Sequence, residues 1–401
     1  MSGHFDDAAL NVRPSDTISG MSSTALKVCA VGVIATVAGF FVEREIFFQS
    51  YLIAFIFWLS ISLGSLALLM VQHLSGGAWG IVSRRVFESA ARTLPLMALL
   101  FLPIAFDVHH LFAWARPEAL TDPIIMQKAA FLNVPFFYIR AVVYFTIWIG
   151  LMWRLTSWSA AQDEAPQLLP GPEDRKFRVF SGRGLVLFML TVTGMSVDWI
   201  MSLDPHWYST IIGVLSVGGE GLSTLAFTIV ILAALSKVKP MSDVMVPERF
   251  HDLGKLMFAF VMLWAYFSVS QLIIVWSANL PEEIPFYLKR FNGPWGWVSV
   301  VVLVGHFIVP FSFLLSTRIK RTPALAARIA LFILAMRAVE IAWMMAPMMR
   351  EGTHNGPSWL DFAAVLGLGA LWLPFFFRNL ASRAIVPVHD PYLKDVLHGG
   401  H

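Results

Sequence analysis

Long apolar runs alternate with short polar segments along almost the whole chain. The runs are about twenty residues long, which is the length that a helix needs to cross roughly 30 Å of hydrocarbon. Membrane β-strands would instead give stretches of about ten residues with alternating hydrophobicity. Between charged residues, prolines and glycines the pattern predicts spans at 25–42, 51–72, 86–106, 134–153, 184–203, 208–235, 251–277, 295–315, 324–346 and 359–378.

This pattern predicts an all-α integral membrane protein with about ten transmembrane helices. The transmembrane domain is expected at 25–378, between polar tails at 1–24 and 379–401. The first apolar run leads into the charged segment 43–45 rather than into a small-residue cleavage site, so the first tail and span are expected to be retained. Between the fourth and fifth spans the pattern predicts a long loop at 154–183.

A short internal echo suggests a repeat. An asparagine followed two residues later by proline and then an aromatic residue opens the fourth span, at Pro135, and the eighth, at Pro294. An offset of four helices preserves direction, which predicts two parallel four-helix bundles, about 51–203 and 208–346, with peripheral first and last spans. Chance, or the preference for proline at the start of a helix, explains such a short match equally well.

Composition supports a membrane protein and gives it an orientation. The 401 residues are 57% hydrophobic and 14% charged, which leaves too few polar side chains for a water-soluble surface. Most lysines and arginines outside the spans fall on the side that carries both tails, so the positive-inside rule places both termini in the cytoplasm. Because these residues explain the net charge of +3, no nucleic-acid partner is expected.

The chain is not expected to carry a redox centre. Cys29 is the single cysteine, which excludes an intrachain disulfide, a cysteine-ligated iron–sulfur cluster and a C-x-x-C-H haem attachment site. The sequence also has no nucleophile elbow, P-loop, zinc motif or dinucleotide fingerprint. We therefore expect no metal site, no covalently bound cofactor and no self-contained catalytic site.

Ionisable residues within the spans are the functional candidates, because a charge in hydrocarbon is costly unless it pairs, contacts water or faces the bundle interior. Arg337 and Glu340 lie three residues apart on one helix face, which fits either a structural ion pair or a proton path. Glu220 lies deep in the sixth span without a basic neighbour in sequence, which fits a proton relay or a protonated packing residue. The glycines around it predict a close helix approach or a broken helix.

His306 is the only histidine clearly in the middle of a span. It is either a hydrogen-bonded packing residue or a proton relay. A bis-histidine haem is not expected, because no second central histidine is present.

Further candidates lie near the outer ends of the spans. Asp198, Asp204 and His206 form either a proton exit or a solvated rim. Arg140, which enters the fourth span, either pairs with Asp198 as a structural ion pair or extends toward the surface.

At the cytoplasmic end, His251 and Asp252 begin the seventh span and are candidates for proton uptake. Asp252 also suits a helix start, where a carboxylate complements the macrodipole. Arg92 and Arg328 are expected to reach lipid phosphates.

Several stretches of the chain carry recognisable motifs. They are FLNVPFFYIR at 131–140, VDWIMSLDPHWYS at 197–209, FHDLGKLMF at 250–258 and FSVSQLIIVWS at 267–277. Together with the ten spans, these stretches resemble the ActF subunits of bacterial alternative complex III, within the NrfD/PsrC-like membrane family. The resemblance covers most of 25–380, and its most specific part is Asp-Trp-x-Met-Ser-Leu-Asp-Pro-x-Trp.

The resemblance implies NrfD-like four-helix bundles and a bacterial cytoplasmic membrane. It implies a subunit of a quinol:cytochrome c or other electron-acceptor oxidoreductase, which supports quinol oxidation and proton conduction. This subunit would be non-catalytic or quinone-binding, with a quinone or quinol as its candidate ligand. The implied partners are an ActC-type NrfD-like subunit, an iron–sulfur subunit, c-type cytochrome subunits, small membrane subunits and lipids, with haem c and iron–sulfur clusters held by the partners.

A stand-alone proton-coupled secondary transporter is the alternative hypothesis. Buried carboxylates and glycine-interrupted helices also suit substrate translocation. The two hypotheses differ in what purifies with the chain, since only the first predicts haem and iron–sulfur absorbance.

Overall fold

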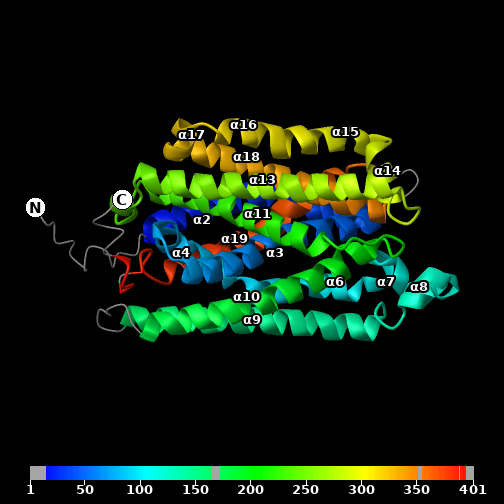
Figure 1. The fold of residues 1–401 in the computed structure, drawn as a ribbon, viewed down its shortest axis with the longest axis horizontal. Helices are drawn as coiled ribbons and strands as arrows, with labels where there is room; N and C mark the ends of the chain where they lie inside the picture. The colour runs from blue at the N-terminus through cyan, green and yellow to red at the C-terminus, as the bar shows by residue number, and fades with distance from the viewer. Residues whose placement is uncertain (1–14, 165–171, 351–354, 388, 394–401) are drawn as a thin grey trace, which may run out of the picture.

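The computed structural model describes residues 15–164, 172–350, 355–387 and 389–393. Within these ranges the chain is helical and has no strand, and ten helical spans are long and apolar enough to cross a membrane. The spans run along the length of an elongated bundle (Figure 1). The predicted all-α membrane fold is therefore confirmed.

Each span is a single helix or a series of short consecutive helices. The spans are α2 (Ser15–Val42), α3 (Arg44–Ser75), α4 to α6 (Ala78–Ala91, Leu94–Leu100, Leu102–Phe106), α9 (Val134–Glu164), α10 (Pro172–Trp199), α11 (Ile212–Leu235), α13 (Pro247–Ala278), α15 with the π-helix η4 and α16 (Pro294–Val301, Val302–Ile308, Val309–Leu314), α18 (Pro323–Met349) and α19 (Trp359–Ala381). Short helices connect them: α7 (Val108–Leu111), α8 (Pro123–Lys128), α12 (Met241–Val244), α14 (Pro285–Phe291) and α17 (Thr317–Arg321).

The helices extend beyond several predicted boundaries. Helix α2 begins at Ser15, inside the predicted tail 1–24, and α19 continues to Ala381. Most of the predicted loop at 154–183 is helical, because α9 runs to Glu164 and α10 starts at Pro172. Hydropathy identifies only the part of a helix that can lie in hydrocarbon. The helix continues into the neighbouring polar residues because its backbone hydrogen bonds do not depend on side-chain polarity. The rest of that loop, like the tail before Ser15, lies outside the described residues.

Helix α3 occupies the centre of the bundle. Its most apolar segment is entirely buried, and its main neighbours are α4, α10, α11, α18 and α19. Helices α4 to α6, α9 and α10 surround one side of it, while α11, α13, α15 to α16 and α18 form a second group. The second group packs on α3 through α11 and α18 and on α10 through α11. The sequence repeat proposed for these two groups stays a prediction.

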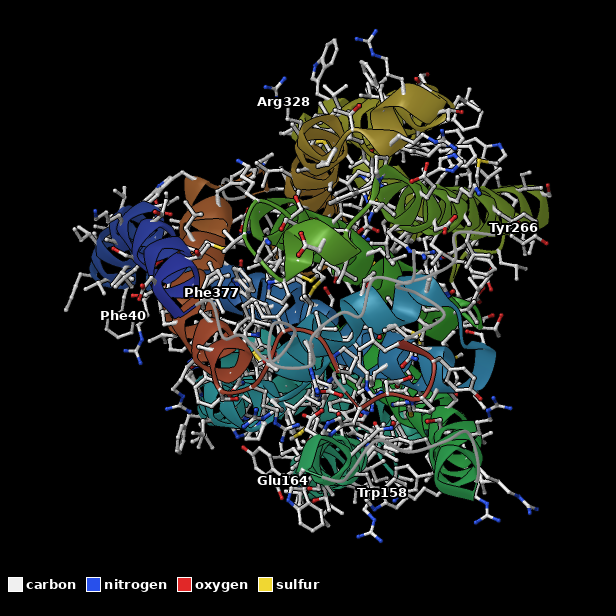
Figure 2. All side chains as sticks on the ribbon, turned by 90° about the vertical axis from the view of Figure 1, so that its left-hand side faces the viewer. Phe40, Trp158, Glu164, Tyr266, Arg328 and Phe377 are labelled. Carbon is white, nitrogen blue, oxygen red and sulfur yellow. The ribbon has the colours of Figure 1, made fainter. Side chains whose placement is uncertain are left out.

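The first and last spans pack against each other at one side of the bundle. Figure 2 shows α2, in blue, beside α19, in orange. A side chain at Gly32 would collide with the backbone of Gly367, so glycine permits this close approach. Thr36 strengthens it by donating its hydroxyl to the carbonyl of Ala363 at 2.9 Å.

An ion-pair network closes one end of the bundle. Glu88 accepts from Arg84 at 3.1 Å and from Arg85 at 2.7 Å, and all three side chains are buried. Arg84 also pairs with Asp390 at 2.6 Å, and Arg85 pairs with Asp163. The network therefore joins α4 to α9 and to the C-terminal segment. Both arginines precede the predicted span 86–106, whereas in the structure they are buried within α4.

Replacement of Gly64 by alanine is expected to destabilise the bundle. A Cβ at Gly64 would collide with the carbonyl oxygen of Glu220, which belongs to the backbone of α11 and cannot rotate away. We expect Gly64→Ala to lower the free energy of unfolding by about 1–3 kcal/mol, as overpacking does elsewhere. Thermal unfolding in detergent measures this loss.

Gly150→Ala is the matched control, because nothing lies within 4 Å of a Cβ added at Gly150. Gly150→Ala should leave the midpoint temperature of thermal unfolding unchanged or raise it slightly. Equal midpoints for the two variants would show that the α3–α11 contact is looser than described.

Candidate functional site

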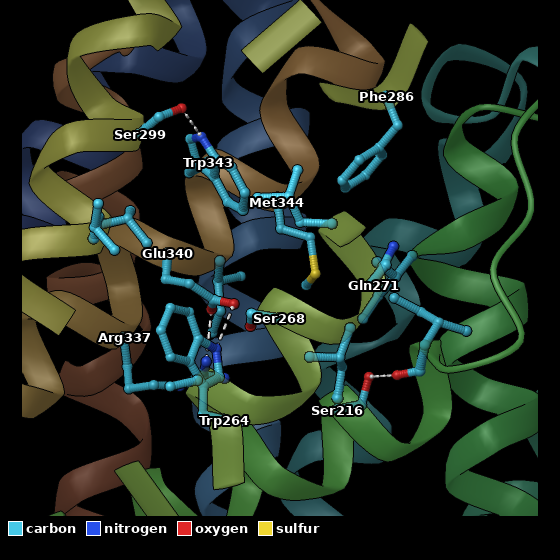
Figure 3. A pocket seen from close by; sticks show the side chains of 18 of the residues that line it. Ser216, Trp264, Ser268, Gln271, Phe286, Ser299, Arg337, Glu340, Trp343 and Met344 are labelled. Carbon is cyan, nitrogen blue, oxygen red and sulfur yellow. Dashed lines mark hydrogen bonds and ion pairs between the residues drawn. The ribbon is translucent and has the colours of Figure 1, made fainter. Parts of the chain in front are cut away.

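A cavity of about 450 Å³ lies between the second helix group and helices α3 and α10, and it is the principal candidate site (Figure 3). It is bounded by α3, α10, α11, α13, α14, α15, η4 and α18. Most of its lining is aliphatic or aromatic. The polar groups that line it are Ser60, Ser216, Glu220, Ser268, Gln271, Ser299, Arg337 and Glu340, with Trp207, Trp264, Tyr287 and Trp343.

The cavity opens through the side of the bundle. Val269 of α13 lines it from one side, and Val300 and Leu303 of the eighth span line it from the other. These side chains are 49%, 50% and 54% exposed, although they lie within apolar spans. An exposed aliphatic side chain in a span is on the side surface of the helices, where lipid or a neighbouring helix packs. The opening between α13 and the eighth span therefore lies on the side of the bundle and not at either of its ends.

Aromatic rings and one ion pair close the end of the cavity next to α14. The rings of Trp207 and Phe286 stack with their centroids 4.2 Å apart. Lys289 of α14 donates to Asp204 at 2.9 Å, which joins α14 to the segment before α11. The connecting helix α14 is therefore part of the cavity wall at this end.

Arg290 holds α14 against α18. Its guanidinium donates to the carbonyls of Trp343, at 3.1 Å, and Met344. The Trp343 carbonyl lacks its usual helical donor, because Pro347 four residues later has no N–H. Burial lowers the pKa of Arg290 to about 9, so the group still carries its charge at neutral pH. Arg290 lies between the predicted spans 251–277 and 295–315, where an exposed side chain is expected, yet the structure buries it completely.

A charged pair forms the deepest wall of the cavity. Arg337 donates to Glu340 at 2.6 Å and to the hydroxyl of Ser223 at 3.2 Å. Glu340 also accepts from the indole of Trp264 at 3.3 Å. A side chain at Gly219 would collide with the guanidinium, so this glycine provides space for Arg337 against α11. The close helix approach, rather than a broken helix, explains the glycines of α11.

Glu220 of α11 lines the cavity near this charged pair. The side chain is 3% exposed. Its Oε2 atom has no hydrogen-bond partner among the described residues. Buried oxygens without a protein partner usually bond water or a ligand. Glu220 is therefore the carboxyl group most available to a molecule in the cavity.

His306 lies directly behind Trp264. The two ring centroids are 4.1 Å apart, and neither ring nitrogen of His306 has a partner among the described residues. The surrounding helix is π-helical over Val302–Ile308, shortly before Pro310, which cannot donate to the His306 carbonyl. Such π-helical turns occur often at functional sites. His306 is thus near the charged pair without lining the cavity itself.

Asp198 lies apart from the cavity, in the first helix group. Arg140 donates to it twice, each time at 2.7 Å, and the Tyr144 hydroxyl donates to it at 2.7 Å. Asp198 is 1% exposed, and its three donors satisfy both oxygens. The structure thus shows the ion pair between the fourth and fifth spans, the first of the two expectations for Arg140.

Asp204 and His206 lie at the end of the bundle that contains α8 and α14. His206 shares a hydrogen bond with Asp122 at 2.7 Å, and both side chains are partly exposed. The amide of Ile124 donates to Asp122 and lowers the pKa of that carboxyl. This arrangement fits the solvated rim better than a buried proton exit.

His251 and Asp252 lie at the beginning of α13, whereas the cavity is next to the later part of this helix. Asp252 bonds Lys255 at 3.4 Å, and both side chains are substantially exposed. The structure brings four of the sequence candidates together at the cavity: Glu220, Arg337, Glu340 and His306. The other candidates lie elsewhere. Asp198 pairs with Arg140 in the first helix group, and His251 and Asp252 lie together at the start of α13.

Trp264 and Trp343 are site residues that sequence reasoning missed. Trp264 connects His306 to Glu340, and Trp343 donates its indole N–H to Ser299 at 2.7 Å. Tryptophans in a membrane protein are usually interfacial anchors, so their residue type alone does not mark them as site residues. The position of Trp264 in the middle of the predicted span 251–277 was an available signal, whereas Trp343 lies close to the end of the span 324–346.

Neutralising the two cavity carboxylates should have unequal effects on stability. Glu340→Gln leaves the buried charge of Arg337 without its ion-pair partner, so we expect a loss of about 3 kcal/mol. Glu220→Gln removes a carboxylate oxygen that has no protein partner and should cost less than about 1 kcal/mol. Thermal unfolding in detergent compares the pair. A larger loss from Glu220→Gln would contradict the assigned contacts.

Comparison with known proteins leaves the geometry as the main guide to function. No protein-family model matches the chain, and no curated protein matches it. Membership of the NrfD/PsrC-like family therefore stays a prediction that rests on the sequence stretches.

Proposed function

We propose that this chain is a membrane subunit of a quinol-oxidising electron-transfer complex, and that its cavity binds the ring of a quinone or quinol. The observation that carries the proposal is an apolar cavity that opens through the side of the bundle and ends at buried ionisable groups. The electron acceptor is a haem or iron–sulfur centre of a partner subunit, in agreement with the family resemblance. The membrane is the bacterial cytoplasmic membrane, with both termini inside.

The side opening supports a lipid-soluble ligand. A quinol ring carries an apolar tail that stays in hydrocarbon, and Val269, Val300 and Leu303 offer an apolar passage for such a tail. The volume of about 450 Å³ lies within the range of roughly 300–1,000 Å³ that is common for small-molecule sites. A few polar groups at the end of an apolar pocket suit a ring with two hydroxyl groups.

The buried wall supports proton transfer. Oxidation of a quinol to a quinone releases two electrons and two protons. The electrons pass to the partner's redox centre. Glu220 accepts one of the two protons, because one of its oxygens has no protein donor, and the second proton passes to water. Arg337 stabilises negative charge at that wall and is held in place by Glu340 and Ser223. His306 and Trp264 extend the polar region behind it.

The transporter alternative fits the cavity less well. A path for a polar substrate needs a polar lining and openings toward water. Here the lining is mainly apolar, and the exposed lining residues belong to the side surface of the bundle. Purification of the tagged chain from native membranes distinguishes the two functions. Co-purifying haem and iron–sulfur absorbance supports the complex, whereas a chain that purifies alone, without them, refutes it.

Leu303→Trp should reduce the amount of quinone that purifies with the chain. The larger ring would fill the side opening, where Leu303 is 54% exposed. Quinone extracted per mole of protein, quantified by mass spectrometry, measures the effect. Leu190→Trp is the matched control, because Leu190 is 66% exposed on α10 and does not line the cavity. Equal quinone content in both variants would argue against entry between α13 and the eighth span.

Glu220→Leu should slow quinol oxidation while quinone content stays near that of the unmodified chain. The substitution removes the proton acceptor but keeps the apolar volume, so turnover should fall by about 10²-fold or more. Turnover and proton release of the purified complex with a short-chain quinol measure the effect. Normal turnover with unchanged proton release would remove Glu220 from the mechanism.

A further inference from the structure

A second charged cluster lies at the end of the bundle that contains α17 and the start of α13 (Figure 1). His251, Gly254, Lys255 and Phe258 repeat at intervals of three and four residues, so they share one face of α13. This face packs against α17. The cluster is separate from the cavity.

Lys320 of α17 lies across the α13 face. A Cβ at Gly254 would be 2.8 Å from Lys320 Cγ, so the lysine stem fills the space that the glycine leaves. The ammonium lies 5.6 Å from the ring centre of Phe258. Burial and the neighbouring Lys255 lower the pKa of Lys320. No carboxylate pairs with this ammonium among the described residues.

The surrounding charges leave the cluster positive. Asp252 is 3.4 Å from the Lys255 ammonium, and Glu248 is 4.0 Å from the Arg321 guanidinium. All four side chains are at least 42% exposed, so these pairs contribute little and exchange readily with water or ligands. Lys320 then adds a cation that neither carboxylate neutralises.

An apolar surface continues from the cluster toward the middle of the span. Phe258 contacts Phe311 of α16 with ring centroids 5.6 Å apart. Phe313 and Leu315, also near the end of the eighth span, are 47% and 57% exposed. Cations that border an exposed apolar surface match a ligand with an anionic head and a hydrocarbon tail.

We propose that Lys255, Lys320 and Arg321 bind the phosphate headgroup of an anionic phospholipid, with its acyl chains along α13 and α16. The cations supply charge-assisted hydrogen bonds to the phosphate oxygens. A lipid, rather than free phosphate, uses both the charge and the neighbouring apolar surface. Figure 2 looks onto this end of the bundle, where Arg328 of α18 lies at the periphery. The site does not depend on the quinone proposal, because it shares no residue with the cavity.

The test compares lipid retention by full-length chains. Native mass spectrometry counts cardiolipin bound to the chain after exchange in mixed phosphatidylcholine and cardiolipin micelles. The double variant Lys255→Ala with Lys320→Ala should bind cardiolipin about thirtyfold more weakly, given the usual contribution of lysines near anionic lipid. Cardiolipin should raise the thermal unfolding midpoint of the unmodified chain more than that of the variant.

The double variant Lys237→Ala with Lys239→Ala is the matched control, because it removes two exposed lysines from another loop without touching the cluster. It should bind cardiolipin as the unmodified chain does. Equal weakening in both variants would show nonspecific charge attraction and overturn the site. An equal midpoint shift with inorganic phosphate would show a phosphate site instead. If the alanine variant does not fold, Lys255→Gln, at a largely exposed position, must weaken retention alone, and unchanged retention refutes the proposal.

Discussion

The cost of burying charge away from water organises this molecule. Arg140 pairs with Asp198 at 2.7 Å, and Arg350 pairs with Asp361 at 2.5 Å. Each pair joins separate helices, so the contact that neutralises the buried charges also holds the two helices together. Arg290 meets the requirement differently, because it bonds backbone carbonyls of a proline-containing helix. Buried pairs of this kind stabilise little by themselves, but losing one partner is costly.

The cavity wall differs from these paired sites, because some of its buried polar groups have no partner among the described residues. Glu220 has an oxygen without a protein donor, and His306 has two nitrogens without partners among the described residues. Elsewhere in the bundle, small hydroxyl side chains mostly bond their own helix, as Ser196 and Thr146 do. Other buried polar atoms without a partner among the described residues, such as His73 Nε2 and Trp199 Nε1, lie away from the cavity, whereas Glu220 lines it. Its place on the cavity wall, together with its free oxygen, distinguishes Glu220 from the carboxylates of the structural ion pairs.

Much of the fold, but only part of the site, follows from sequence. Apolar run length gives the ten spans, and the three-residue spacing of Arg337 and Glu340 predicts that they share a helix face. Sequence could not place Arg290, because its partners are carbonyls freed by Pro347 on another helix. The burial of Arg84 was equally hidden, since it depends on Asp390 more than three hundred residues away. Both arginines are buried because partners from distant parts of the chain bond their guanidinium groups.

The opening between α13 and the eighth span determines how the cavity is supplied. A molecule that enters there arrives by two-dimensional diffusion within the leaflet, after partitioning from water. Occupancy is then governed by mole fraction in the bilayer and not by aqueous concentration. The apparent potency of a hydrophobic competitor would consequently change when membrane is diluted with added lipid, even though its intrinsic affinity stays constant.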